Sequence, residues 1–200
     1  MKKLVYLISP NKIYNDFYDD LKKVLAFKNV KFFQLRLKKE KKSKIIKIAK
    51  KIRKITKKNK VKLIINDHPD ISKIIKADGC HLGQDDISIV NSKKYLKKKI
   101  IGVTCHNSLS LAKKAIRSGA SYIAFGAFNS SKTKKTKYTA SIKILNKASK
   151  LSKLPIVAIG GINSSNYKNL LLNKADFLAI SGYIWNNKKY KPLEAIEKLK

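Results

Sequence analysis

Short apolar runs of strand length alternate along this chain with longer segments whose apolar residues recur at helical spacing. The expected strands cover residues 4–9, 32–37, 61–66, 79–82, 100–105, 122–126, 156–160 and 177–181. The expected helices cover residues 14–28, 42–59, 70–77, 87–97, 108–118, 139–152, 164–173 and 192–199. Strict alternation of this kind requires parallel strands joined by right-handed crossovers. The chain is therefore expected to adopt an α/β fold.

Eight strand–helix units in 200 residues favour a closed (β/α)₈ barrel, the TIM barrel. An open doubly wound sheet is the alternative, but no G-x-G-x-x-G motif follows the first expected strand. Local signals agree with the helices: Ser108 suits an N-cap, Gly119 a helix end, and Pro192 a first helical turn. No long linker or repeat divides the chain, so residues 1–200 are expected to form a single domain.

The net charge of +35 comes almost entirely from Lys, because Arg36, Arg53 and Arg117 are the only arginines. A nucleic-acid binder would more often use Arg with interleaved aromatic residues. A solvated basic surface that attracts small anionic substrates is therefore favoured over a specific nucleic-acid or membrane partner. Homo-oligomers remain possible.

The apolar run near the N-terminus is too short for a signal peptide, and no run has the length of a membrane span. A cytoplasmic location is expected. Cys80 and Cys105 each end an apolar run and lack metal-site spacing, so they are expected to be small buried thiols without a disulfide.

Acidic residues follow two successive expected strands: Asp67 after residues 61–66, and Asp86 after residues 79–82. Because neighbouring parallel strands end at the same rim, these carboxylates are expected to meet there. One or two carboxylates, together with water and substrate phosphate oxygens, are typical ligands of Mg²⁺. Asn66 could orient a substrate, and Asp85 is a rival ligand. Capping of the following helices is the alternative explanation.

The sequence QLRLK at residues 34–38 places Gln34, Arg36 and Lys38 on one face of an expected strand. If Leu35 and Leu37 pack against helices, the three polar groups line the barrel interior, where an anionic ligand would be their partner. A solvated edge strand is the alternative.

Loops after the later strands carry groups that suit phosphate. Ser131, Thr133 and Lys134 offer two hydroxyls and a cation. Gly160 and Gly161 follow the seventh expected strand, and Ser181 and Gly182 follow the eighth, where barrels of this type usually bind phosphate. Ordinary turn chemistry would also explain these glycines.

The three histidines are treated separately. His81 is expected to be a hydrogen-bonded core residue, His68 a turn residue, and His106 could face the barrel mouth. Three scattered histidines without a thiol cluster give no zinc site.

Seven motifs, in order, resemble those of the thiamine-phosphate synthase family, from about Val5 to Trp185. The motifs are QLRLK (34–38), ND (66–67), ADGCHLGQDD (77–86), GVTCH (102–106), NSSKTK (129–134), AIGGI (158–162) and AISGYI (179–184). The resemblance implies a TIM barrel that joins hydroxymethylpyrimidine diphosphate to hydroxyethylthiazole phosphate, giving thiamine phosphate and diphosphate.

The resemblance also implies roles for individual residues. The pyrimidine diphosphate would be held by Gln34, Arg36, Lys38 and Asn66. Mg²⁺ would be bound by Asp67 and Asp86, while Thr104 and Lys134 would contact the pyrimidine or the diphosphate. The thiazole phosphate would be received by Ser131, Thr133, Gly161, Ser181 and Gly182. Arg36, Lys38, Thr104 and Lys134 are thus the expected catalytic residues.

Two segments depart from the family pattern. Asn129-Ser130-Ser131 replaces the usual aromatic-Pro-Thr, and Tyr183 is bulky where a small residue is usual. Two rival functions remain. One is a thiazole tautomerase of the TenI type, with His106 as acid and base, although the ND, GQ-x-D and T-x-TK elements disfavour it. The other is a basic polyanion-binding protein.

Overall fold

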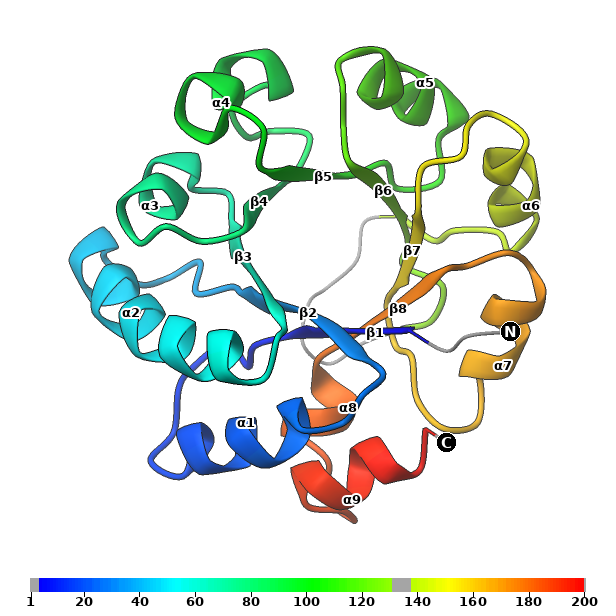
Figure 1. Cartoon of the computed structure of the whole chain (residues 1–200). Coiled ribbons are helices and arrows are strands. Elements are labelled where there is room, and N and C mark those ends of the chain that lie inside the picture. Colours follow the sequence, from blue (N-terminus) through cyan, green and yellow to red (C-terminus); the bar gives the residue numbers. More distant parts are fainter. Residues whose placement is uncertain (1–3, 131–137, 200) are drawn as a thin grey trace.

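The computed structural model describes residues 4–130 and 138–199, in which eight parallel strands close into a barrel in chain order (Figure 1). The predicted TIM barrel is confirmed, and the open-sheet alternative is wrong. The strands are β1 (Leu4–Ile8), β2 (Val30–Leu35), β3 (Lys62–Asn66), β4 (Gly79–Leu82), β5 (Ile100–Thr104), β6 (Tyr122–Phe125), β7 (Ile156–Ile159) and β8 (Phe177–Ile180).

Helices surround the barrel (Figure 1). They are α1 (Phe17–Leu25), α2 (Lys42–Lys58), α3 (Pro69–Ile74), α4 (Ile89–Leu96), α5 (Leu109–Arg117), α6 (Lys143–Ser149), α7 (Tyr167–Leu172), α8 (Gly182–Trp185) and α9 (Pro192–Glu197). The predicted local signals are present: Ser108 Oγ accepts a hydrogen bond from the Leu111 amide, Gly119 has φ +85°, and Pro192 begins α9.

Two elements differ from the sequence-based expectation. Strand β2 ends at Leu35, so Arg36 and Lys38 lie in the loop beyond it and only Gln34 belongs to the strand. Leu35 and Leu37 are nonetheless buried beneath the helices, as expected. The short helix α8 was not predicted, because four residues are too few to show a helical period.

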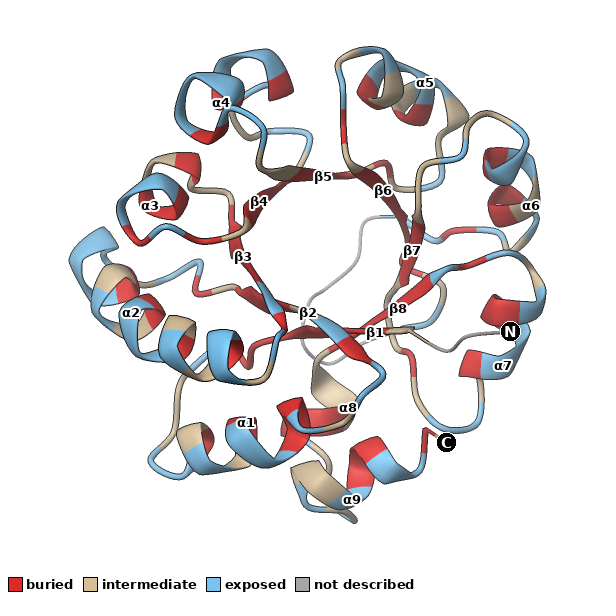
Figure 2. Cartoon of the chain, viewed as in Figure 1, coloured by how far each residue is buried: buried red, intermediate tan, exposed pale blue. Residues whose placement is uncertain are grey.

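Buried residues lie along the strands and on parts of the surrounding helices (Figure 2). They form two apolar cores on opposite sides of the barrel wall. The larger core fills the space between strands and helices. The smaller core fills the barrel interior and includes Tyr6, Ile64, Tyr122, Val157 and Phe177. The barrel is therefore a packed core rather than a pore, and ligands can bind only at its ends.

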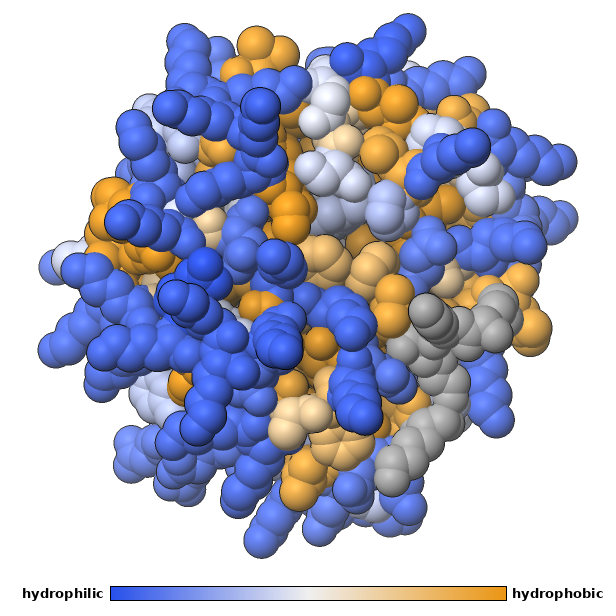
Figure 3. All heavy atoms as spheres, in the orientation of Figure 1, coloured by the Kyte–Doolittle hydropathy of each residue, from blue (hydrophilic) through white to orange (hydrophobic). Residues whose placement is uncertain are grey.

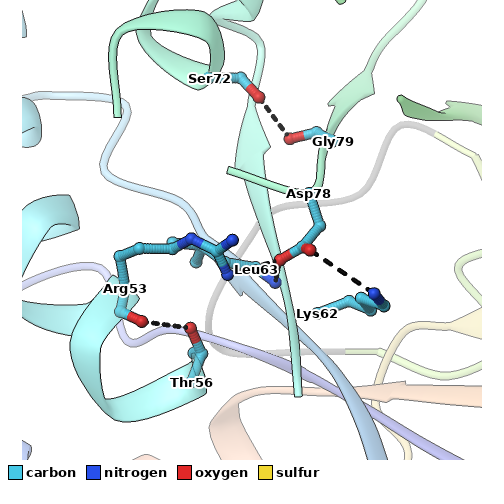
Figure 4. Close-up of polar contacts among 7 residues, drawn as sticks. All are labelled: Arg53, Thr56, Lys62, Leu63, Ser72, Asp78 and Gly79. Atoms are coloured by element: carbon cyan, nitrogen blue, oxygen red, sulfur yellow. Dashed lines mark hydrogen bonds and ion pairs between the residues drawn. The ribbon is translucent and has the colours of Figure 1, made fainter. Parts of the chain in front are cut away.

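A repeated polar clamp joins the N-terminal ends of strand pairs. Asp78, just before β4, accepts a hydrogen bond from the Leu63 amide at 2.8 Å and pairs with Arg53 of α2 at 2.9 Å (Figure 4). Asp176 accepts from the Ile156 amide at 2.8 Å before β8, and Ser121 accepts from the Ile101 amide at 3.0 Å before β6. Each clamp satisfies a strand-end amide that the ladder leaves unpaired.

We expect Asp78→Ala to lower the free energy of unfolding by about 2 kcal/mol, because it removes a charge-assisted bond to Arg53 and the acceptor for the amide of the buried Leu63. Urea denaturation measures the change. Asp85→Ala, which removes an exposed carboxylate, is the control. Equal stability of the two variants would contradict a structural role for the clamp.

Hydrophilic side chains cover most of the face shown in Figure 3. Cys80 and Cys105 are buried and form no disulfide, as expected. Within residues 4–130 and 138–199, no helix has the length and apolarity needed to cross a membrane.

Candidate active site

Two cations stand beside the end of β2. The side chain of Arg36 is partly buried, and burial lowers the pKa of its guanidinium while the nearby Asp67 and Asp86 carboxylates oppose that shift. Lys38 is more exposed, and its Nζ lies 3.0 Å from Asp67 Oδ2. An arginine keeps its charge at any physiological pH, so burial does not remove the positive charge of Arg36.

Asp67 and Asp86 meet at the mouth of the barrel, as the sequence predicted. The Asp67 amide donates to the His81 carbonyl at 2.8 Å, which joins the end of β3 to β4. Asp86 Oδ2 accepts from the Gly83 amide at 2.6 Å. Partial burial raises the pKa of Asp86, and the neighbouring Asp67 carboxylate, within hydrogen-bond reach, raises it further. Two acidic groups are thus held together although they repel one another.

A divalent cation fits this arrangement, because it would be attracted by both carboxylates and would relieve the repulsion between them. Among the described residues, no three His, Cys, Asp or Glu side chains gather where they could hold a metal ion. Two carboxylates suit Mg²⁺, which keeps several waters and takes substrate phosphate oxygens. Asp85 is exposed and Asp86 is not, which favours Asp86 as the ligand.

Asp67 adopts a left-handed backbone conformation, with φ +63°. Asp tolerates this region better than most residues other than glycine. The turn is completed by a hydrogen bond from the His68 amide to the Asn66 carbonyl at 2.8 Å. Asn66, the last residue of β3, is buried. The turn thereby places an amide and a carboxylate side by side at the mouth.

Below the mouth, buried polar groups form a continuous hydrogen-bonded chain. Gln34 Nε2 donates to the Tyr6 hydroxyl at 2.9 Å, and the Tyr6 and Tyr122 hydroxyls are 2.7 Å apart. Tyr122 contacts His81 Nδ1 at 2.8 Å, and His81 Nε2 contacts Thr104 Oγ1 at 2.8 Å. The expectation that His81 is a hydrogen-bonded core residue is confirmed.

Thr104 is also held by a residue that does not belong to this hydrogen-bonded chain: the side-chain amide of Gln84 donates to the Thr104 carbonyl. Gln84 belongs to the loop that carries Asp86. The loop after β4 is therefore attached to the end of β5, which positions the metal-binding candidate relative to Thr104.

Burial lowers the pKa of His81 from its ordinary value of 6.5 to about 4. The unfolded chain then binds more protons than the folded one between pH 4 and 6.5, so this residue makes stability rise with pH across that window. His81 is expected to contribute about 3 kcal/mol to the change in the free energy of unfolding across that window. Urea denaturation at several pH values should show a shallower pH dependence in His81→Gln; an identical dependence would contradict a neutral buried imidazole.

The loops after β7 and β8 form the other side of the mouth. Gly160 and Gly161 have φ +108° and +57°, and a side chain on Gly161 would collide with the Asn129–Ser130 backbone. Ser181 Oγ donates to the Ser9 carbonyl at 3.0 Å, and α8 begins at the next residue, Gly182. A short extra helix after the eighth strand is a common phosphate-binding element of TIM barrels.

Ser131, Thr133 and Lys134, the predicted phosphate-clamp residues, lie outside the described residues. His106 lies two residues beyond β5, with its ring 4.2 Å from that of Tyr138. His68 directly precedes α3, as expected for a turn residue.

Comparison with known proteins decides the family. The model of the family described as thiamine monophosphate synthase matches residues 5–184. The chain belongs to the thiamine monophosphate synthase family. It is 65% identical over 200 residues to the thiamine-phosphate synthase of Pelagibacter ubique, a match that covers 100% of this chain and 97% of that relative. It is 36% identical over 196 residues to the thiamine-phosphate synthase of Erythrobacter litoralis, covering 96% and 92%.

A solved structure of the thiamine monophosphate synthase type has the same architecture. Thiamine phosphate pyrophosphorylase from Pyrococcus furiosus superposes with a TM-score of 0.87 at 25% identity, covering 99% of this chain and 94% of that one. The resemblance stated from the motifs is therefore confirmed for family and fold.

Sequence reasoning missed two residues of this thiamine monophosphate synthase site, Tyr6 and Tyr122. Both lie within expected strands, and neither was assigned a role of its own there. The alternation of side chains along a strand was the available signal, since it directs Tyr6 and Gln34 into the same barrel interior. The partnership of the two tyrosines, 116 residues apart, has no local signature.

Proposed function

We propose that this protein is a thiamine-phosphate synthase, which joins 4-amino-2-methyl-5-(diphosphooxymethyl)pyrimidine to hydroxyethylthiazole phosphate. The observation that carries the proposal is the pair Asp67 and Asp86, held together at the mouth beside Arg36 and Lys38. Two carboxylates among cations suit a metal-bound diphosphate. The 65% identity to a thiamine-phosphate synthase over the whole chain supports the same function.

In the reaction, the bond between the pyrimidine methylene carbon and the diphosphate oxygen breaks, and its electron pair leaves with the diphosphate. The thiazole nitrogen donates the electron pair of the new carbon–nitrogen bond. The electron-rich aminopyrimidine stabilises the positive charge that develops on the methylene carbon. No protein nucleophile or strong base is required.

The residues supply positioning and charge. Arg36 and Lys38 would neutralise charge that grows on the leaving diphosphate, and Lys134 is assigned the same role by its motif. Gln34, Asn66 and Thr104 would hold the pyrimidine. Fixed donors of this kind stabilise a transition state because they need no reorganisation as charge moves.

Mg²⁺ is proposed as the cofactor, with Asp67 and Asp86 as its protein ligands. When bound, it would withdraw electron density from the diphosphate and make it a better leaving group. The residues Ser131, Thr133, Gly161, Ser181 and Gly182 are proposed to receive the thiazole phosphate, by the backbone amides and hydroxyls that glycine-rich loops expose. The substrates are small molecules, and a cytoplasmic location is proposed with them.

Genetic complementation tests the proposed function. A bacterium that lacks its own thiamine-phosphate synthase should grow without thiamine when it expresses this chain. A thiazole tautomerase or a polyanion-binding protein would not restore growth, because neither joins the two rings. Failure of the well-expressed protein to restore growth would therefore overturn the proposal.

A further inference from the structure

The buried chain of hydrogen bonds has a direction, because each hydroxyl carries one proton. The Tyr6 hydroxyl accepts from Gln34 Nε2, so its own proton points to the Tyr122 hydroxyl, 2.7 Å away. The Tyr122 hydroxyl accepts that bond, so its proton points to His81 Nδ1 at 2.8 Å. The first half of the chain therefore requires His81 Nδ1 to be an acceptor.

The second half follows from the acceptor role of His81 Nδ1. A ring nitrogen that accepts a hydrogen bond carries no proton, so the imidazole carries its one proton on the other ring nitrogen. Since Nδ1 accepts from Tyr122, the ring proton lies on Nε2, which then donates to Thr104 Oγ1 at 2.8 Å. Thr104 Oγ1 accepts this bond, so its own proton is directed away from the chain.

The two ends of this hydrogen-bonded chain therefore present different groups: one end presents an acceptor and the other a donor. Gln34 donates from Nε2 within the chain, and the other polar atom of the same side-chain amide, Oε1, is an acceptor. It presents an acceptor. Thr104 is the last residue of β5 and is only partly buried, so its hydroxyl presents a donor.

The rings of Tyr6 and Tyr122 are held by packing in the barrel interior. Their rings belong to the interior core, with Tyr6 stacked on Phe32 at 5.2 Å and Tyr122 stacked on His81 at 5.7 Å. Packing on both rings fixes the hydroxyl positions. Reversal of the bond direction would require all the groups of the chain to reorganise together.

We propose that Tyr6, Tyr122 and His81 are positioning residues that fix an acceptor at Gln34 and a donor at Thr104. Resting on the proposed function, this pattern complements the aminopyrimidine ring: its amino group donates to Gln34 Oε1, and a ring nitrogen accepts from the Thr104 hydroxyl. A pyrimidine that bears a keto oxygen in place of the amino group would present an acceptor to an acceptor.

The first test is the tautomer of His81 in the intact protein at pH 7, measured by NMR on protein labelled with ¹⁵N in histidine. The spectra of His68→Gln and His106→Gln identify the other two rings. We expect His81 to be neutral and protonated at Nε2. A ring protonated at Nδ1, or at both nitrogens, would overturn the proposal whether or not the protein makes thiamine phosphate.

The second test is Tyr122→Phe, which interrupts the chain without altering Gln34 or Thr104. We expect KM for the pyrimidine diphosphate to rise about tenfold, equivalent to the loss of one well-placed hydrogen bond. KM for the thiazole phosphate should not change, and Tyr95→Phe on α4 is the control. An unchanged pyrimidine KM in a folded variant would contradict the proposal, and the tautomer measurement decides it if Tyr122→Phe does not fold. Absence of thiamine phosphate from the wild-type reaction would instead count against the proposed function.

Discussion

Asp67→Asn and Asp86→Asn are each expected to lower the rate of thiamine phosphate formation by about 100-fold or more, because each removes one of two proposed metal-ligand carboxylates. Asn is the sharpest replacement at both positions. It tolerates the left-handed conformation of residue 67, where φ is +63°, and it retains an oxygen for the Gly83 amide at residue 86. Steady-state kinetics across a range of Mg²⁺ concentrations measures the effect.

The stability of Asp86→Asn should rise, although its activity falls. The raised pKa of Asp86 means that the folded carboxyl holds its proton more tightly than the unfolded one. Its contribution to stability is therefore present in acid and is lost as the pH rises from the ordinary value towards the raised one. At neutral pH without metal, Asp86→Asn should melt at a higher temperature than the wild type, and the difference should vanish in acid.

Asp85→Asn is the matched control, since it removes an exposed carboxylate from the same loop and should change neither activity nor melting temperature. The salt bridge from Lys38 to Asp67 adds little to stability, because the lysine is half exposed. Near-wild-type activity in Asp67→Asn or Asp86→Asn, with an unchanged Mg²⁺ requirement, would contradict the assignment of the metal site.

Gly102→Ala should destabilise the barrel by about 3 kcal/mol and lower the melting temperature by roughly 10 °C. Gly102 and Tyr122 are partners in the register of β5 and β6, and a β-carbon at residue 102 would overlap the Tyr122 ring and its hydroxyl. The ring cannot move aside, because Tyr6 and His81 bind its hydroxyl at 2.7 and 2.8 Å. Thermal and urea denaturation measure the loss.

A double-mutant cycle identifies the ring as the cause. In a Tyr122→Ala background the added methyl group has space, so Gly102→Ala should be nearly neutral there. The same loss of stability in both backgrounds would show that some other contact of residue 102 is responsible.

The fold could be predicted because the strand and helix patterns of the chain are local. Each strand of the barrel lies within or close to an apolar run, and the rim residues Asp67 and Asp86 follow from where two such runs end. The end of β2 was placed two residues too late, because Leu37 continues the apolar alternation although it packs in the loop after the strand. The alternation of apolar residues indicates which side chains are buried, and buried side chains can continue into the loop after a strand ends.

The remainder of the site depends on contacts that no local pattern contains. The hydrogen-bonded chain takes residues from β1, β2, β4, β5 and β6, so it appears only when the barrel closes. The raised pKa of Asp86 likewise depends on burial in the folded barrel and on Asp67, which follows a different strand. The roles of Ser131, Thr133 and Lys134, which their motif implies, stay predictions.

Formation of thiamine phosphate from both substrates by the purified protein tests the central claim most directly. Product separated by liquid chromatography and identified by mass should appear together with diphosphate when both substrates and Mg²⁺ are present. It should be absent when either substrate is omitted, and EDTA should abolish it until Mg²⁺ is restored in excess. No product in the complete mixture would contradict the proposed function, and equal product formation in EDTA would contradict the role of the metal.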